Sequence, residues 1–227
     1  MGIHPRVAPL AVLALTPVLG GCFLLFPPDL PPLTPVTLTV TYAGNASPAR
    51  TLAALRPLLI HVTDVGDTRP EPDKVGYRRS LFGIPGAPFH TSEPVPKIFH
   101  DALVAEFIRS GHRVVSEDAD FLIAGTVSTF WLNLGVGFWE WDLVGTAAVE
   151  LRVASPVANE TVFTGQYHVD YEEKSAFAGV SVLEHVMNVT LERLVWKIGT
   201  DPDLIRALGA QRNRVVAPTG FEPVFQP

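Results

Sequence analysis

The segment LVGTAAVELRVA at residues 143–154 alternates apolar and polar side chains. Thr146, Glu150 and Arg152 fall on one face of an extended chain, because successive side chains of a strand point to opposite sides. The opposite face carries Leu143, Ala147, Val149, Leu151 and Val153. Residues 161–171 repeat the pattern, with Phe163, Tyr167, Val169 and Tyr171 on one face. Such alternation is typical of an antiparallel sheet that exposes one face to water.

Two segments with helical spacing lie outside these strands. Residues 95–110 and 182–198 carry apolar residues three or four positions apart, which predicts helices with one buried face. The residues that we expect to be buried are Phe99, Leu103, Phe107, Leu183, Met187 and Leu194. Further strands are predicted at 36–42, 57–62, 75–82, 112–115 and 121–134, loops at 64–72 and 83–94, and a short helical turn at 202–208. The fold class is therefore predicted to be α+β, a mostly antiparallel sheet with two long helices packed on one face.

The N-terminus has the organisation of an export signal. Arg6 precedes an acid-free apolar run from Val7 to Leu19, which is too short to span a bilayer. The run ends in Leu19-Gly20-Gly21-Cys22, which resembles the lipobox of bacterial lipoproteins. That resemblance implies cleavage before Cys22, acylation of its thiol and a membrane anchor. The alternative is an ordinary signal peptide followed by a free cysteine, but the chain has one cysteine and hence no partner for an intrachain disulfide.

The composition of the remaining sequence indicates a tether, a domain and a tail. After the signal peptide (1–21), residues 22–35 contain five prolines and predict an extended tether that is lipidated at its first residue. Residues 36–210 are long enough for a single periplasmic domain, and 211–227 predict a disordered tail. The net charge of −6 argues against nucleic acid as a partner, since phosphate binding needs clustered basic residues. In bacterial lipoproteins, Asp directly after the acylated cysteine tends to retain the protein in the inner membrane. Phe23 stands at that position here, so the resemblance to a lipobox implies sorting to the outer membrane.

No arrangement of residues predicts an active site. The sequence has no nucleophile elbow, phosphate-binding loop or dinucleotide fingerprint, and its histidines share no metal-ligand spacing. His168 and Asp170 alternate on one strand face, where two solvated polar residues are the ordinary interpretation. We therefore predict no catalytic residue, no metal site and no cofactor.

Tryptophan is concentrated in one place. Trp131, Trp139 and Trp141 surround Gly135 and Gly137, which predict the tip of a hairpin. One interpretation is that these side chains pack beneath the helices as core. The other is an exposed surface for a protein partner or a membrane, because aromatic side chains are enriched at interfaces.

Residues 58 to about 198 resemble the YajG-like lipoproteins of the bacterial envelope. The resemblance rests on Leu58-Leu59-Ile60, on Asp67-Thr68-Arg69-Pro70 followed by Val75-Gly76, and on residues 107–115, 121–127 and 163–165. Asp67 and Arg69 are expected to fix the loop after the second strand, by pairing or by bonding backbone amides. The layout is also similar to that of auxiliary lipoproteins of ABC-type lipid transporters.

Both resemblances imply a sheet with two helices on one face, and neither implies a catalytic residue. The expected function is that of a non-enzymatic lipoprotein on the periplasmic face of the outer membrane. It would support envelope assembly or lipid transport through contacts with an envelope protein. The alternative is a periplasmic auxiliary subunit of an ABC-type transport or secretion machine, and a small hydrolase is a more remote third class.

Overall fold

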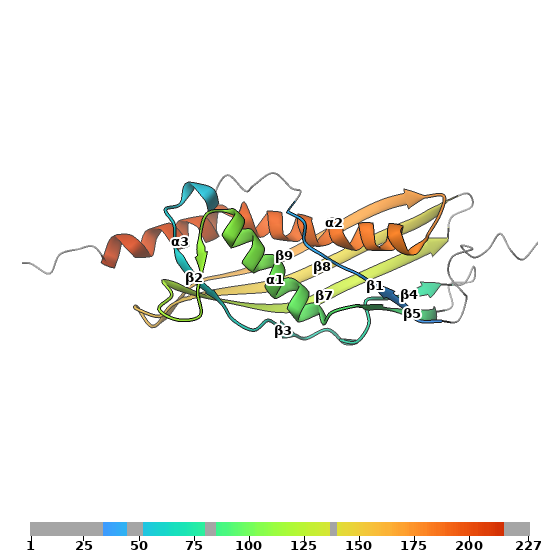
Figure 1. Cartoon of the computed structure of the whole chain (residues 1–227), viewed down its shortest axis with the longest axis horizontal. Helices are drawn as coiled ribbons and strands as arrows, with labels where there is room; N and C mark the ends of the chain where they lie inside the picture. Colours follow the sequence, from blue (N-terminus) through green and yellow to red (C-terminus); the bar gives the residue numbers. More distant parts are fainter. Residues whose placement is uncertain (1–33, 45–51, 80–84, 137–139, 216–227) are drawn as a thin grey trace, which may run out of the picture.

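The computed structural model describes residues 34–44, 52–79, 85–136 and 140–215 (Figure 1). Cys22, Trp139 and most of the predicted tether lie outside the described residues. The strands are β1 (Val36–Leu38), β2 (Leu59–Val62), β3 (Gly66–Asp67), β4 (Gly76–Arg79), β5 (Pro85–Thr91), β6 (Arg113–Val114), β7 (Phe121–Val136), β8 (Trp141–Ser155) and β9 (Glu160–Ser175). The helices are α1 (Val95–Arg109), α2 (Val180–Gly199) and α3 (Pro202–Val215), with a short 3-10 turn at Leu52–Ala54.

Strand β7 organises the sheet. Along one edge it pairs antiparallel with β8, which in turn pairs antiparallel with β9. Along its other edge it pairs with β2, then β3, then β4, and all three run parallel to it. Strand β5 joins β4 antiparallel, and β1 joins β5 parallel. The α+β class is confirmed, but the sheet is mixed rather than mostly antiparallel, because periodicity reports the burial of a strand and not its direction.

Two predicted loops contain strands. Residues 83–94 were expected to form a loop because of Pro85, Gly86 and Pro88, yet Pro85–Thr91 forms β5. Burial of Ala87 and Phe89 outweighs the prolines, and the carbonyl of Phe89 accepts a bond from Val75 N (2.8 Å). Within the predicted loop at 64–72, Gly66–Asp67 forms β3. The glycine and proline residues of these two segments therefore led to loop predictions where the chain forms β3 and β5.

The helices α1 and α2 lie over the same face of the sheet (Figure 1). All six side chains predicted to be buried on them are buried, with Phe99 stacked edge-on against Phe130 of β7 at 5.3 Å between ring centroids. The predicted turn at 202–208 is instead the longer helix α3, so the described chain has three helices rather than two. Apolar Leu204 and Leu208 of α3 are fully buried, which extends the core beyond the end of α2.

Gly76 is required at the junction of β4 with β7. Its φ of +150° is rarely adopted by other residues, and a Cβ atom there would lie 2.3 Å from the carbonyl oxygen of Leu132. Neither the backbone of β7 nor the neighbouring Phe89 ring leaves space for it. The close approach lets β4 continue the parallel edge of β7 where β3 has stopped.

After β1 the chain leaves the sheet and crosses the helices (Figure 1). Its backbone amides are bonded by α2 side chains: Thr39 N donates to Glu184 Oε1 at 2.7 Å, and Thr41 N to Asn188 Oδ1 at 2.9 Å. Arg109 of α1 donates to the Gly44 carbonyl at 3.0 Å. The predicted strand at 36–42 is therefore shorter, because helix side chains replace a strand partner beyond Leu38.

Candidate functional site

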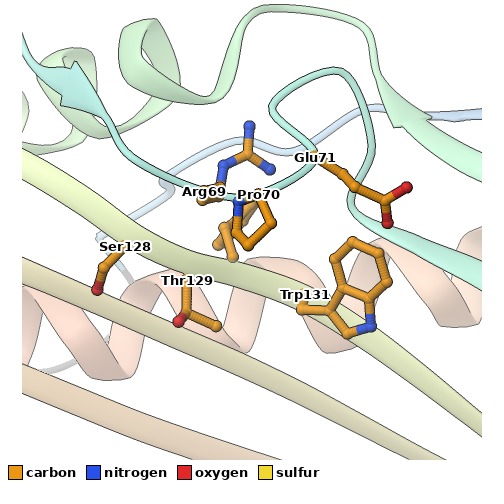
Figure 2. Close-up of a pocket in the computed structure, with 7 residues that line it drawn as sticks. Arg69, Pro70, Glu71, Ser128, Thr129 and Trp131 are labelled. Atoms are coloured by element: carbon orange, nitrogen blue, oxygen red, sulfur yellow. The ribbon is translucent and has the colours of Figure 1, made fainter.

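A pocket of about 260 Å³ opens beside β7, where the strand has no parallel neighbour. The last β3 pair is Asp67 with Val127, and the first β4 pair is Gly76 with Leu132. Between these pairs the chain that joins β3 to β4 swings away from β7 (Figure 2). The pocket is lined by Arg69, Pro70, Glu71, Ser128, Thr129, Phe130 and Trp131.

An ion pair fixes the wall of this pocket. Arg69 Nη2 lies 2.8 Å from Asp67 Oδ2, Arg69 Nε lies 3.0 Å from Asp67 Oδ1, and only 3 % of the arginine side chain is exposed. Asp67 Oδ1 also accepts the backbone amide of Arg69 at 3.0 Å. The guanidinium then donates to the carbonyls of Lys74 (2.8 Å) and Pro72. The loop is thus tied at both ends, and the guanidinium is engaged within it.

A charged cluster forms the rim beside Trp131. Lys74 Nζ lies 2.9 Å from both Glu71 Oε1 and the Tyr77 hydroxyl, which itself donates to Glu71 Oε1 at 2.6 Å. The hydrogen bond from Tyr77, followed by that from Lys74, lowers the pKa of the Glu71 carboxyl. Hydrogen bonds to Tyr77 and Glu71 raise the pKa of the Lys74 amine. Both groups are therefore charged at neutral pH, and the Tyr77 ring packs edge-on against Trp131 at 5.7 Å.

A bulge in β7 turns Trp131 toward this rim. The register against β8 shifts between Val127 and Thr129, so the buried positions change from odd to even residue numbers. Phe130 consequently points into the core beneath α1, where it is fully buried. Trp131, the next residue, lies half-buried on the face of the sheet opposite α1 and α2. We call this the open face; it also carries Thr146, His168 and Asp170.

The structure brings together only part of the predicted surface. Trp131 and Arg69 line the same pocket, which joins the aromatic hairpin to the loop motif. Trp141 shares its strand parity with Leu143 and packs, half-buried, against the core on the helix-covered face. Trp131 and Trp141 therefore lie on opposite faces of the sheet, although both belong to the β7–β8 hairpin.

Sequence reasoning missed the pocket itself. Glu71, Ser128 and Thr129 belong to no motif, and they meet Pro70 of the loop motif only because three segments pair in succession along β7. The available signal was Ser128, which interrupts the apolar alternation of residues 121–134 and marks the bulge. A second site of about 350 Å³ lies between residues 40–42 and α1.

This arrangement suits binding through shape more than chemistry. Arg69 and Lys74 are engaged in ion pairs, and the apolar side chains of Pro70 and Trp131 line the pocket. Within the described residues, no three His, Cys, Asp or Glu side chains gather as a metal site would require. The helices of the described chain also include none with the length and apolarity needed to cross a membrane.

Solved structures that resemble this chain include three bacterial proteins. Protein XCC0632 from Xanthomonas campestris is 14 % identical, with a TM-score of 0.47 and coverage of 80 % of this chain and 97 % of that one. The PelC dodecamer from Paraburkholderia phytofirmans is 14 % identical (TM-score 0.35; 61 % and 88 % covered). Lipoprotein GNA1162 from Neisseria meningitidis is 11 % identical (TM-score 0.31; 60 % and 96 % covered).

Among curated proteins, none matches this chain. A family model, Lipoprotein_16, described as "Uncharacterized lipoprotein", matches residues 62–209, which is more than half of the sequence. The match spans the pocket, the long strands and helices α1 and α2. It confirms a bacterial lipoprotein, while the finer YajG-like resemblance stays a prediction. The chain therefore belongs to the Lipoprotein_16 family, and with it to the lipid-anchored proteins of the bacterial envelope.

Proposed function

We propose that this protein is a non-enzymatic lipoprotein that binds an envelope protein through the Trp131 pocket. Acylated Cys22 holds it on the periplasmic face of the outer membrane, where it supports envelope assembly or lipid transport. The observation that carries the proposal is the preformed pocket beside β7, whose wall is fixed by the buried Asp67–Arg69 pair. The YajG-like resemblance of the sequence agrees with this role.

The size of the pocket suits a single protein side chain. At about 260 Å³ it lies just below the range of about 300–1,000 Å³ that is usual for small-molecule pockets. Interface hot spots are single large side chains seated in well-packed pockets, and tryptophan is among the residues enriched there. Trp131 supplies one wall, and its contact with Tyr77 holds the ring in place. A rigid wall lowers the entropy cost of binding.

Comparison of two tryptophan variants tests this function. Trp131→Ala removes the pocket wall, whereas Trp196→Ala removes an indole of α2 that is 45 % exposed and lies away from the pocket. Both proteins would be affinity-purified from detergent-solubilised envelopes after chemical cross-linking. We expect Trp131→Ala to lose the partner while its melting curve stays cooperative, and Trp196→Ala to retain the partner.

The same purification separates the two functional classes. A permease captured by the wild-type chain and lost from Trp131→Ala would assign it to an ABC-type machine instead of an assembly role. Retention of every partner by a folded Trp131→Ala protein would contradict the proposal. The anchor is tested separately: Cys22→Ala should move the protein from the membrane fraction to the soluble periplasm.

A further inference from the structure

One end of the sheet gathers the membrane tether and the ends of the longest strands. Pairing places Val36 of β1 level with Phe89, Gly76 and Leu132, and Leu132 lies level with Gly145 and Tyr171. Because β1 runs opposite to β7, the chain before Val36 enters from the side on which β7 ends. Val136 pairs there with Trp141, and Trp141 pairs with Ser175 at the end of β9. We call this the tether end (right in Figure 1).

Phe177 projects from the tether end. It lies in the connection from β9 to α2, and 69 % of its surface is exposed. Its position is fixed on both sides, because its amide donates to Ser175 Oγ at 3.3 Å and Ala178 is fully buried. A large apolar side chain is thus held outward in water by a connection that is itself anchored in the core.

We propose that the tether end rests on the lipid bilayer, with Phe177 inserted at the headgroup boundary. The inference rests on the proposed lipid attachment at Cys22. Eleven residues lie between Cys22 and Thr34, where the described chain begins, and a fully extended proline-rich chain would rise about 3.1 Å per residue. The tether end therefore stays within about 40 Å of the membrane. A weak apolar contact there benefits from a high effective concentration, because the anchor already holds the protein near the bilayer.

The charges of the tether end indicate which lipid it contacts. Lys174 lies 3.1 Å from Glu140 and 3.6 Å from Asp142, so its positive charge is shared by two acids. This cluster does not itself attract anionic headgroups, whereas the apolar ring of Phe177 leaves water when it is buried at the headgroup boundary. The fitting occupant is a zwitterionic bilayer, which is bound through apolar contact.

Isolated exposed apolar residues are ordinary on protein surfaces. A second such residue far from the tether therefore provides a control for Phe177. Val157, in the turn between β8 and β9, is 74 % exposed but lies at the opposite end of the same strand. The two turns are closely matched, since each also carries an exposed alanine, Ala176 or Ala158, and a serine hydroxyl that accepts a backbone amide. They provide a test pair within one chain.

The experiment uses the full lipidated protein in phosphatidylcholine–phosphatidylethanolamine vesicles. Cys22 is the chain's one cysteine and its thiol is acylated, so Ala176→Cys and Ala158→Cys each offer one thiol for an environment-sensitive fluorophore. Vesicle flotation reports the anchor, and a headgroup-linked nitroxide lipid reports proximity to the bilayer. We expect strong quenching at position 176, with a blue-shifted emission, and little quenching at position 158.

A second pair of variants tests Phe177 directly. Adding Phe177→Ser to the Ala176→Cys protein should remove most of the quenching and the blue shift, while Val157→Ser should leave both unchanged. Equal quenching at the two ends, or quenching that survives Phe177→Ser, would overturn the inference although the protein still floats. Failure to float would refute the anchor and this inference with it, while the pocket experiment would still stand.

Discussion

Arg69 shows how one buried charge shapes the candidate site. Its guanidinium joins Asp67 of β3 to the carbonyls of Pro72 and Lys74, so the whole loop folds around it. Removing one partner of a buried ion pair leaves the other charge uncompensated, which is far more costly than losing an exposed pair. The stability of the loop and the shape of the pocket therefore depend on the same contact.

We expect Asp67→Ala to lower the free energy of unfolding by about 3 kcal/mol, because Arg69 keeps its charge in a buried position. Asp101→Ala is the control, since its ion pair with Lys97 is more than half exposed and should change stability little. Chemical denaturation of the wild-type, Asp67→Ala and Asp101→Ala proteins measures the differences in the free energy of unfolding. An Asp67→Ala protein as stable as the Asp101→Ala control would show that the loop does not depend on the pair.

His112 predicts how stability responds to acid. The residue is 4 % exposed, and burial lowers the pKa of its imidazole, although the nearby Leu52 backbone opposes the shift. The backbone amide of Leu58 donates a hydrogen bond to His112 Nδ1 at 3.4 Å. Because Nδ1 can accept this bond only when it carries no proton, the bond favours the neutral ring. The unfolded chain binds the proton more tightly, with an ordinary histidine pKa near 6.5. The contribution of neutral His112 to the free energy of unfolding is thus complete above about pH 6.5, and it declines as the pH falls below that value.

We expect unfolding free energies measured from pH 8 to pH 5 to fall on the acid side for the wild-type protein. His112→Gln should flatten that fall, because glutamine offers an uncharged acceptor to the Leu58 amide. His168→Gln alters an exposed histidine and should leave the fall intact. An unchanged slope in His112→Gln would assign the acid sensitivity to other groups.

At the scale of elements, Gly145 of β8 allows α2 to pack closely against the sheet. A Cβ atom on Gly145 would lie 2.1 Å from Thr190 Oγ1 and 3.2 Å from Thr190 Cβ. Thr190 is fully buried, and its hydroxyl donates to the Val186 carbonyl at 2.7 Å. The side chain therefore cannot turn away without losing a buried hydrogen bond.

Gly145→Ala should accordingly destabilise the protein by about 1–3 kcal/mol, the usual cost of overpacking a core. Gly66→Ala provides the comparison, because its added methyl group would meet Thr126 at an ordinary 3.5 Å. Thermal melting measures both. If Gly145→Ala melts like Gly66→Ala, then α2 sits farther from β8 than described.

The elements also show where sequence reasoning reaches its limit. Helices α1 and α2 and the strands β7, β8 and β9 were predictable, since burial of one face leaves a local period. The parallel pairing of β2, β3 and β4 was not, because it depends on a crossover through α1 and on the close approach at Gly76. For the same reason Arg69 and Trp131 could each be singled out, but their meeting in one pocket could not.

At the scale of the whole molecule, the position of the pocket along β7 sets its height above the membrane. Trp131 precedes Val136, at the end of β7, by five residues, and a strand rises about 3.4 Å per residue. With the tether end on the bilayer, the pocket opens about 17 Å above it, on the face of the sheet that α1 and α2 leave uncovered. A partner that projects only a short distance from the membrane can reach it there.

This geometry predicts that the tether is slack when the protein works. Deleting residues 27–32 shortens the maximum reach of the tether by about 19 Å, which would withdraw a domain that must extend to a distant partner. A domain that rests on the bilayer loses nothing, so we expect the deletion to retain both the anchor and the Trp131-dependent partner. Cross-linking and flotation of the shortened protein measure the two properties. Loss of the partner from a shortened protein that still folds and floats would show that the domain acts at the full reach of its tether.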